Sequence, residues 1–377
     1  MLGHVAVGSW SGGRFMRFGE PITEERLEAL LRPGGGIRTI ITADAYGAGQ
    51  ADALVGRALK SVPRGGYALV GAVGHDFYEG EREGAKGYPR FTDPRLRSPA
   101  KYGDYLRMAT ERSLERCGVD SFDLLLLHNP DRRGFESPEV WEALRDLHGQ
   151  GLTSALGVAP GPANGFTLDL IGCFERYGEL IDWAMIILSP LEPWPGEMVL
   201  DAAARFDVDI VTRVVDYGGL FHDDLLPGHD FPRGDHRGFR PEGWVEAGRE
   251  KLERLRPIAE RHGLTMLQLA CAWNLSHATV GCVAPTLIEE SGGAKPIERK
   301  REELAAVPEI SPLTIEEVVE MRAIGDNTGS MLLKGATPDH EGEEGPDRWA
   351  PAPEQLELAR RWRIDPERDL RRAVRVG

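Results

Sequence analysis

Residues 123–128 read DLLLLH, and this stretch decides the fold. Four consecutive leucines leave no polar position on either face of an extended strand, so both faces must be covered. The runs AMIILS (184–189) and DIVTRVV (209–215) have nearly the same character. Such runs are typical of parallel strands that are covered by helices. The sequence therefore indicates an α/β fold with a buried parallel sheet.

Short apolar runs alternate with helical patterns along most of the chain. We predict eight strands, near residues 4–8, 37–43, 67–73, 122–128, 154–159, 183–189, 209–215 and 279–284. Apolar residues spaced three and four apart predict helices between them, over residues 23–31, 51–60, 105–117, 137–148, 168–177 and 250–262. Ser137 followed by Pro138 is a typical helix start.

Eight strands that alternate with helices predict a closed (β/α)8 TIM barrel, here over residues 1–306. A doubly wound open sheet is the alternative, but it usually has a glycine-rich loop after its first strand. Residues 8–15, GSWSGGRF, do not contain that pattern. Residues 307–377 show helical spacing around Trp362 and also contain Trp349, so we expect a C-terminal extension packed on the barrel.

Two connections are longer than ordinary turns: residues 75–103 after the third strand and 216–244 after the seventh. Both leave the carboxyl end of a strand, which is the end where barrel enzymes have their active sites. We expect these long loops to shape a site for a small-molecule substrate.

Composition excludes several classes of partner. The net charge is -15, and no basic face interleaved with aromatic residues occurs, so we predict neither nucleic acid nor an acidic membrane surface as partner. No apolar stretch approaches the ~20 residues that span a membrane, and we expect a cytoplasmic protein. The four cysteines lie far apart, which predicts reduced thiols, and no spacing predicts a metal site.

Several of these segments, in this order, resemble the aldo-keto reductases: TADAYG (42–47), SLERCGVDSFDLLLLHNPD (113–131), GLTSALGV (151–158) and AERHGLTMLQLACAWNLSH (259–277). The resemblance implies a (β/α)8 barrel that binds NADP(H) at the carboxyl ends of its strands. It also implies a tyrosine that acts as general acid on a carbonyl, aided by a histidine, a lysine and an aspartate. Tyr46 matches the tyrosine and His128 matches the histidine.

The chain departs from the family's pattern at the other two positions. Ile41 stands where the family has its aspartate, and Ala72 stands where it has its lysine. Their joint loss is coherent, because either one alone would be an unpaired buried charge.

The resemblance also implies cofactor contacts that are altered here. Ala159-Pro160 replaces a serine-asparagine pair, Met185 replaces a glutamine, and Arg213 stands where an aromatic residue stacks under the nicotinamide. The candidates to hold the adenosine phosphate after the eighth strand are Lys295, Arg299 and Lys300.

Further polar and aromatic residues lie at the predicted carboxyl ends of strands. Asp44 and His75 are additional catalytic candidates, with a capping role and a solvated loop as their respective alternatives. Arg213 should be buried, so it either pairs with an acid such as Glu192 or Asp216 or holds a substrate anion or carbonyl. Asp223 and Asp224 are expected to be solvated. The substrate-binding candidates are Arg213, Asp76, Glu192, Asp216, Trp10, Tyr78, Trp194 and His222.

Three functions fit this pattern. The first is a divergent NADP(H)-linked oxidoreductase in which Tyr46 is the general acid and His128 polarises the oxygen. The second is a redox-neutral lyase, dehydratase or isomerase that acts on a hydroxylated carbonyl compound, such as a sugar. The third is a catalytically silent binding barrel.

Overall fold

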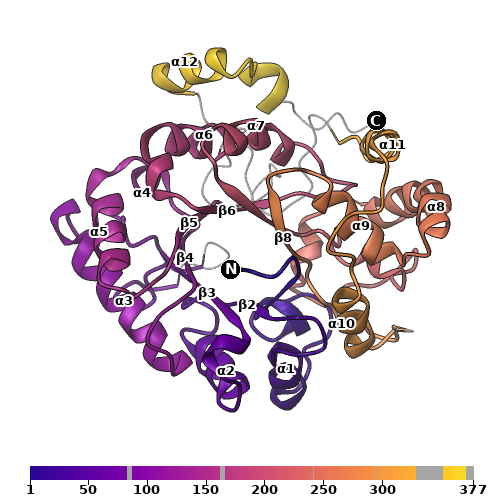
Figure 1. Cartoon of the computed structure of the whole chain (residues 1–377), viewed down its shortest axis with the longest axis horizontal. Helices are drawn as coiled ribbons and strands as arrows, with labels where there is room; N and C mark the ends of the chain where they lie inside the picture. The colour runs from indigo at the N-terminus through magenta and orange to yellow at the C-terminus, as the bar shows by residue number, and fades with distance from the viewer. Residues whose placement is uncertain (83–86, 162–165, 241, 294, 328–350, 371–377) are drawn as a thin grey trace.

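The computed structural model describes residues 1–82, 87–161, 166–240, 242–293, 295–327 and 351–370. Eight parallel strands form one sheet in which each strand pairs with the next in chain order. Figure 1 shows helices as an outer ring around them. The strands are β1 Ala6–Gly8, β2 Thr39–Ile41, β3 Ala68–Val73, β4 Leu124–His128, β5 Leu156–Ala159, β6 Trp183–Ile187, β7 Asp209–Arg213 and β8 Val280–Ala284.

The sheet closes on itself at its two ends. Val5, just before β1, forms a parallel bridge with Val283 of β8. The Val283 amide donates to the carbonyl oxygen of His4 at 2.9 Å. Together with the continuous pairing from β1 to β8, this contact confirms the predicted (β/α)8 barrel.

The four leucines of β4 explain why its sequence does not alternate. Leu124 and Leu126 belong to the cluster that fills the barrel, whereas Leu125 and Leu127 belong to the larger cluster between sheet and helices. All four are fully buried. Because the strand has a dry face on both sides, the period of two carries no polar signal.

The helices lie at or near the predicted positions. Ser137 precedes α5, and Pro138 lies in its first turn, as expected. The helices around the barrel are α1 Glu24–Leu31, α2 Gln50–Leu59, α3 Tyr102–Cys117, α4 Arg132–Glu136, α5 Pro138–Gly149, α6 Phe166–Tyr177, α7 Leu200–Arg205, α8 Trp244–His262, α9 Met266–Leu275 and α10 Ile297–Ala305. No helix among the described residues is long and apolar enough to cross a membrane.

Two further helices, α11 (Ile315–Ile324) and α12 (Pro353–Arg361), follow α10. Figure 1 shows α12, in yellow, outside the ring beside α6. Gln355 of α12 donates to Asp169 of α6 at 2.9 Å, and the Trp362 indole donates to Glu175 at 2.9 Å. The described part of the extension therefore lies against the outer helices, while Trp349 falls outside the described residues.

The four cysteines are free and buried, as predicted from their spacing.

Candidate active site

Tyr46 and His128 come together at the carboxyl end of the barrel. Tyr46 lies in the turns that follow β2 and packs against the cluster inside the barrel, and His128 is the last residue of β4. Their ring centroids are 5.7 Å apart, with the ring planes at 90°. Both residues lie where strands end at the same side of the barrel, the side at which TIM-barrel enzymes bind their substrates.

A second histidine extends this pair. His75 follows β3, and its ring centroid is 5.1 Å from that of His128. The side-chain amide of Asn129 lies 3.1 Å from His75 Nε2, and the carbonyl oxygen of Tyr88 lies 3.0 Å from Nδ1. Arg90 Nη1 also approaches Nδ1, at 3.0 Å. The ring of His75 is thus held by the long loop after β3 and by Asn129, which follows β4.

Burial fixes the protonation states of the three rings. It lowers the pKa of His128 to about 3, with Arg90 and Arg213 adding to the shift, and it lowers the pKa of His75 well below its usual value. Burial also raises the pKa of Tyr46, a shift that Arg213 opposes. At neutral pH the phenol is therefore protonated and both imidazoles are neutral.

Ile41 and Ala72 lie inside the barrel in the same apolar cluster that Tyr46 contacts. Both side chains are buried, as is Met185. These three positions, which the resemblance associates with an aspartate, a lysine and a glutamine, thus add apolar surface next to the phenol. The cation that acts electrostatically on Tyr46 is instead Arg213, the last residue of β7.

Asp44 lies two residues before Tyr46 and is fully buried. Neither of its carboxyl oxygens has a regular hydrogen bond within the described chain. Burial, and the negative charge of Asp52, raise its pKa well above the usual range, against a smaller opposing effect of Arg116. Burial thus favours the protonated form of Asp44 over its anion.

Two of the predicted substrate-binding acids hold loops in place. Asp76 forms an ion pair with Arg97 and accepts hydrogen bonds from the amides of Tyr78 and Glu79, at 3.0 and 2.9 Å. Asp216 accepts from the amides of Gly219 and Thr286, at 2.8 and 2.7 Å. Both carboxylates are fully buried, so these contacts explain their presence without a ligand.

Two more predicted residues have partners away from Tyr46. Glu192 is buried 3.5 Å from Arg240, and burial raises the pKa of its carboxyl. His222 is buried with Nε2 2.8 Å from the carbonyl oxygen of Thr286, and burial lowers its pKa well below the usual value.

The three aromatic residues predicted to bind substrate lie in different parts of the barrel. Trp10 packs inside the barrel with the cluster that Tyr46 contacts. The Tyr78 ring stacks on Phe77, with centroids 4.0 Å apart. Trp194 is buried, and its backbone exchanges two hydrogen bonds with the side chain of Asn327, at 3.0 and 2.8 Å. Of the three, only Trp10 packs with Tyr46 in one cluster.

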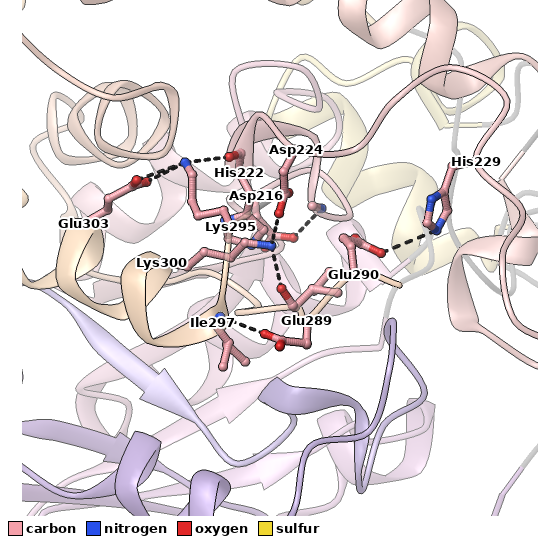
Figure 2. Close-up of polar contacts among 12 residues, drawn as sticks. Asp216, His222, Asp224, His229, Glu289, Glu290, Lys295, Ile297, Lys300 and Glu303 are labelled. Atoms are coloured by element: carbon pink, nitrogen blue, oxygen red, sulfur yellow. Dashed lines mark hydrogen bonds and ion pairs between the residues drawn. The ribbon is translucent and has the colours of Figure 1, made fainter. Parts of the chain in front are cut away.

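Figure 2 shows the loops after β7 and β8, together with the start of α10. This part of a TIM barrel often binds phosphate. Lys300 is fully buried, and its Nζ lies 2.7 Å from Asp224, which is also buried. The expectation that Asp224 is solvated is therefore wrong, because it neutralises this lysine. Lys295 contacts Glu303 at 2.9 Å and the carbonyl oxygen of His222 at 2.8 Å.

The amino end of α10 is also closed by the chain itself. Glu289 accepts a hydrogen bond from the amide of Ile297, the first residue of α10, at 2.7 Å. Nearby, Arg237 pairs with Glu290 and Asp235. Arg299 lies on the exposed side of the helix and pairs with Glu302 at 2.8 Å. Carboxylates thus occupy the positions at which a phosphate would meet the helix end and its cations.

Arg90 and Asn129 were missed by the sequence analysis. Asn129 directly follows His128, so its position after a strand was a usable signal. Arg90 lies in the long loop after β3, where sequence gives no indication of which side chain folds back. No group of three or more histidine, cysteine or acidic residues suited to a metal ion occurs among the described residues.

A family model described as the aldo/keto reductase family matches residues 5–326, so the chain belongs to this family. It is 27% identical over 320 residues to the NADH-specific methylglyoxal reductase of Escherichia coli, covering 81% of this chain and 90% of that protein. It is 29% identical over 287 residues to the 6-dehydroglucose reductase of Agrobacterium fabrum, covering 73% and 81%. Both relatives are named as reductases, so the chain is oxidoreductase-like at the level of the family.

Among solved structures, the glycerol dehydrogenase of Gluconobacter oxydans is similar, with a TM-score of 0.65 and 24% identity. The alignment covers 86% of this chain and 91% of that one. This likeness supports the barrel fold.

Proposed function

We propose that this chain is an aldo-keto reductase family oxidoreductase that interconverts the carbonyl and carbinol forms of a small molecule, with proton transfer to and from its oxygen, which is held by Tyr46 and His128. One observation carries the proposal: a half-buried, protonated phenol lies edge-on to a buried, neutral imidazole at the carboxyl end of the barrel. The named reductase relatives support it.

The chemistry follows from the charges at the site. Tyr46 donates its proton to the substrate oxygen as the carbonyl is reduced, and takes it back in the oxidation direction. Neutral His128 polarises that oxygen through a hydrogen bond. Arg213 takes over the electrostatic role of the missing lysine, because its positive charge stabilises negative charge that develops on the oxygen and on the phenol.

A bound nicotinamide would supply the hydride. The residues after β8 do not fit the adenosine phosphate of NADP(H), because Asp224 and Glu303 neutralise the two lysines and Glu289 caps α10. NAD(H) lacks that phosphate, and carboxylates often bond ribose hydroxyl groups. We therefore favour NAD(H) over NADP(H).

The carboxylates that close the region after β8 also favour a second function, that of a redox-neutral lyase, dehydratase or isomerase. If the closed region after β8 accepts no dinucleotide at all, Tyr46, His128 and His75 remain available to move protons on a hydroxylated carbonyl compound.

A titration of the purified protein with NADH and NADPH, followed by calorimetry, separates these functions. The oxidoreductase proposal expects NADH to bind at least about tenfold more tightly than NADPH. If neither binds at millimolar concentration, the oxidoreductase proposal is wrong and the redox-neutral function takes its place. Tighter binding of NADPH would overturn the preference for NAD(H).

A further inference from the structure

Arg213, which is half-buried at the end of β7, differs from the paired buried cations of the chain. Its Nη2 donates to the carbonyl oxygen of Pro160 at 2.9 Å, and no ion pair joins it to a carboxylate among the described residues. The two acids that the sequence offered as partners are engaged elsewhere: Glu192 with Arg240, and Asp216 with backbone amides. Glu192 acts on Arg213 through space only, so the guanidinium has no direct carboxylate partner among the described residues.

Such an arrangement is costly unless something else supplies the negative charge. A guanidinium remains protonated in proteins, and taking even part of its charge out of water without a carboxylate partner is unfavourable. Three cations of the chain with buried side chains do have such a partner: Arg97 pairs with Asp76, Arg237 with Asp235, and Lys300 with Asp224. The half-buried Arg213 at the barrel mouth lacks one, and its open side there points to a ligand.

The position of Arg213 defines which part of the ligand it holds. Arg213 ends β7, and its Nη2 reaches Pro160, the residue after Ala159, which pairs with His128 in the sheet. The guanidinium therefore lies near His128 and the proposed reacting oxygen. We propose that the substrate is a small oxo- or hydroxy-acid whose carboxylate is held by Arg213 while its carbonyl or hydroxyl oxygen contacts Tyr46 and His128. The inference rests on the proposed function only for the roles of Tyr46 and His128, and the binding of the carboxylate by Arg213 is independent of it.

A carboxylate fits better than a phosphate. A planar guanidinium that uses one nitrogen for Pro160 still presents donors in the fork geometry that a carboxylate matches. A phosphate dianion needs more positive charge or several amides, and the region that usually supplies them in a TIM barrel is closed here by acids.

The test compares charged and uncharged probes of equal shape. We would titrate lactate and lactamide, malonate and malonamide, and inorganic phosphate into the full chain and follow calorimetric heat. Each carboxylate should bind at least about tenfold more tightly than its amide, since a charge-assisted hydrogen bond contributes 1.5–3 kcal/mol. Arg213→Gln should abolish this difference, and Arg213→Lys should keep part of it, whereas Arg254→Gln, at an exposed position of α8, should leave it unchanged.

Equal affinity for acids and amides, or a difference that survives in folded Arg213→Gln, would overturn the inference. Phosphate binding more tightly than malonate would overturn the choice of carboxylate. If Arg213→Gln does not fold, the comparison of probes on the unchanged chain and on Arg213→Lys still decides. Tyr46→Phe separates the two proposals: it should lose turnover and retain carboxylate binding, whereas retained turnover overturns the proposed function alone.

Discussion

At the barrel mouth, half-buried Arg213 forms no ion pair with a carboxylate of the described chain, whereas beyond β8 fully buried Lys300 pairs with Asp224. Both regions lie at the carboxyl side of the same barrel, and both contain a cation withdrawn from solvent. A cation paired within the fold stabilises the fold, and it is no longer available to a ligand. The comparison indicates that the chain can bind an anion at the barrel mouth, beside Arg213, and that it excludes one beyond β8, beside Lys300.

The largest effect is expected from Tyr46→Phe, which removes the proposed proton donor from the mouth. Turnover of any identified substrate should fall by about 10²–10⁴-fold, the usual contribution of general acid catalysis. Tyr67→Phe, which changes a buried tyrosine just before β3, is the matched control and should keep full activity. Steady-state kinetics measures both, and undiminished turnover in Tyr46→Phe would remove the mechanism.

On the other side of the comparison, Lys300→Met tests whether the region beyond β8 is a structural unit. Asp224 would remain buried without its partner, so the free energy of unfolding should fall by about 3–5 kcal/mol. Urea denaturation measures this loss. Arg299→Met changes the adjacent residue, whose exposed pair with Glu302 contributes little to stability. An equal loss in both variants would contradict the distinction.

The barrel itself could be read from the sequence because its signal is repeated. Leu124 to Leu127 are apolar without alternation, and equivalent runs recur before each expected helix. Burial on two faces is a property of each strand on its own, so no knowledge of the other strands is needed to detect it.

The site was only partly predictable. Tyr46 and His128 follow strands at the same end of the barrel, so topology alone brings them together. By contrast, the sequence could not indicate that Glu192 turns to Arg240 and Asp224 to Lys300, because those pairs join loops distant in the chain. These ion pairs decide which charged side chains remain available to a ligand, and they form only when the loops fold.

Neutral His128 at the barrel mouth should make the stability of the chain depend on pH. Its pKa is about 3 in the folded chain and near 6.5 when unfolded, so between these values the unfolded chain binds a proton that the folded chain does not. Stability from this residue is therefore complete above pH 6.5 and is lost as the pH falls toward 3.

Comparison with His128→Gln isolates that effect. Between pH 7 and pH 4 the unchanged chain should lose about 3 kcal/mol more free energy of unfolding than the variant. His148→Gln, at an exposed position of α5, should behave like the unchanged chain. Parallel losses in the unchanged chain and His128→Gln, measured by urea denaturation at each pH, would show that His128 is not kept neutral by burial.

The smallest effect, and the one that sharpens the comparison most, comes from opening the region beyond β8. Glu303→Gln removes the carboxylate that neutralises Lys295 while leaving the lysine in place. Because NADPH and NADH differ only in the adenosine phosphate, the ratio of their affinities isolates any attraction that the released charge exerts on that phosphate. We expect the ratio to shift toward NADPH by about threefold to tenfold, as for one partly exposed charge pair.

Glu302→Gln, one residue earlier and paired with exposed Arg299, should leave the ratio unchanged. A ratio that stays constant in Glu303→Gln would mean that these acids do not face the phosphate, and the exclusion of NADP(H) would then need a different cause.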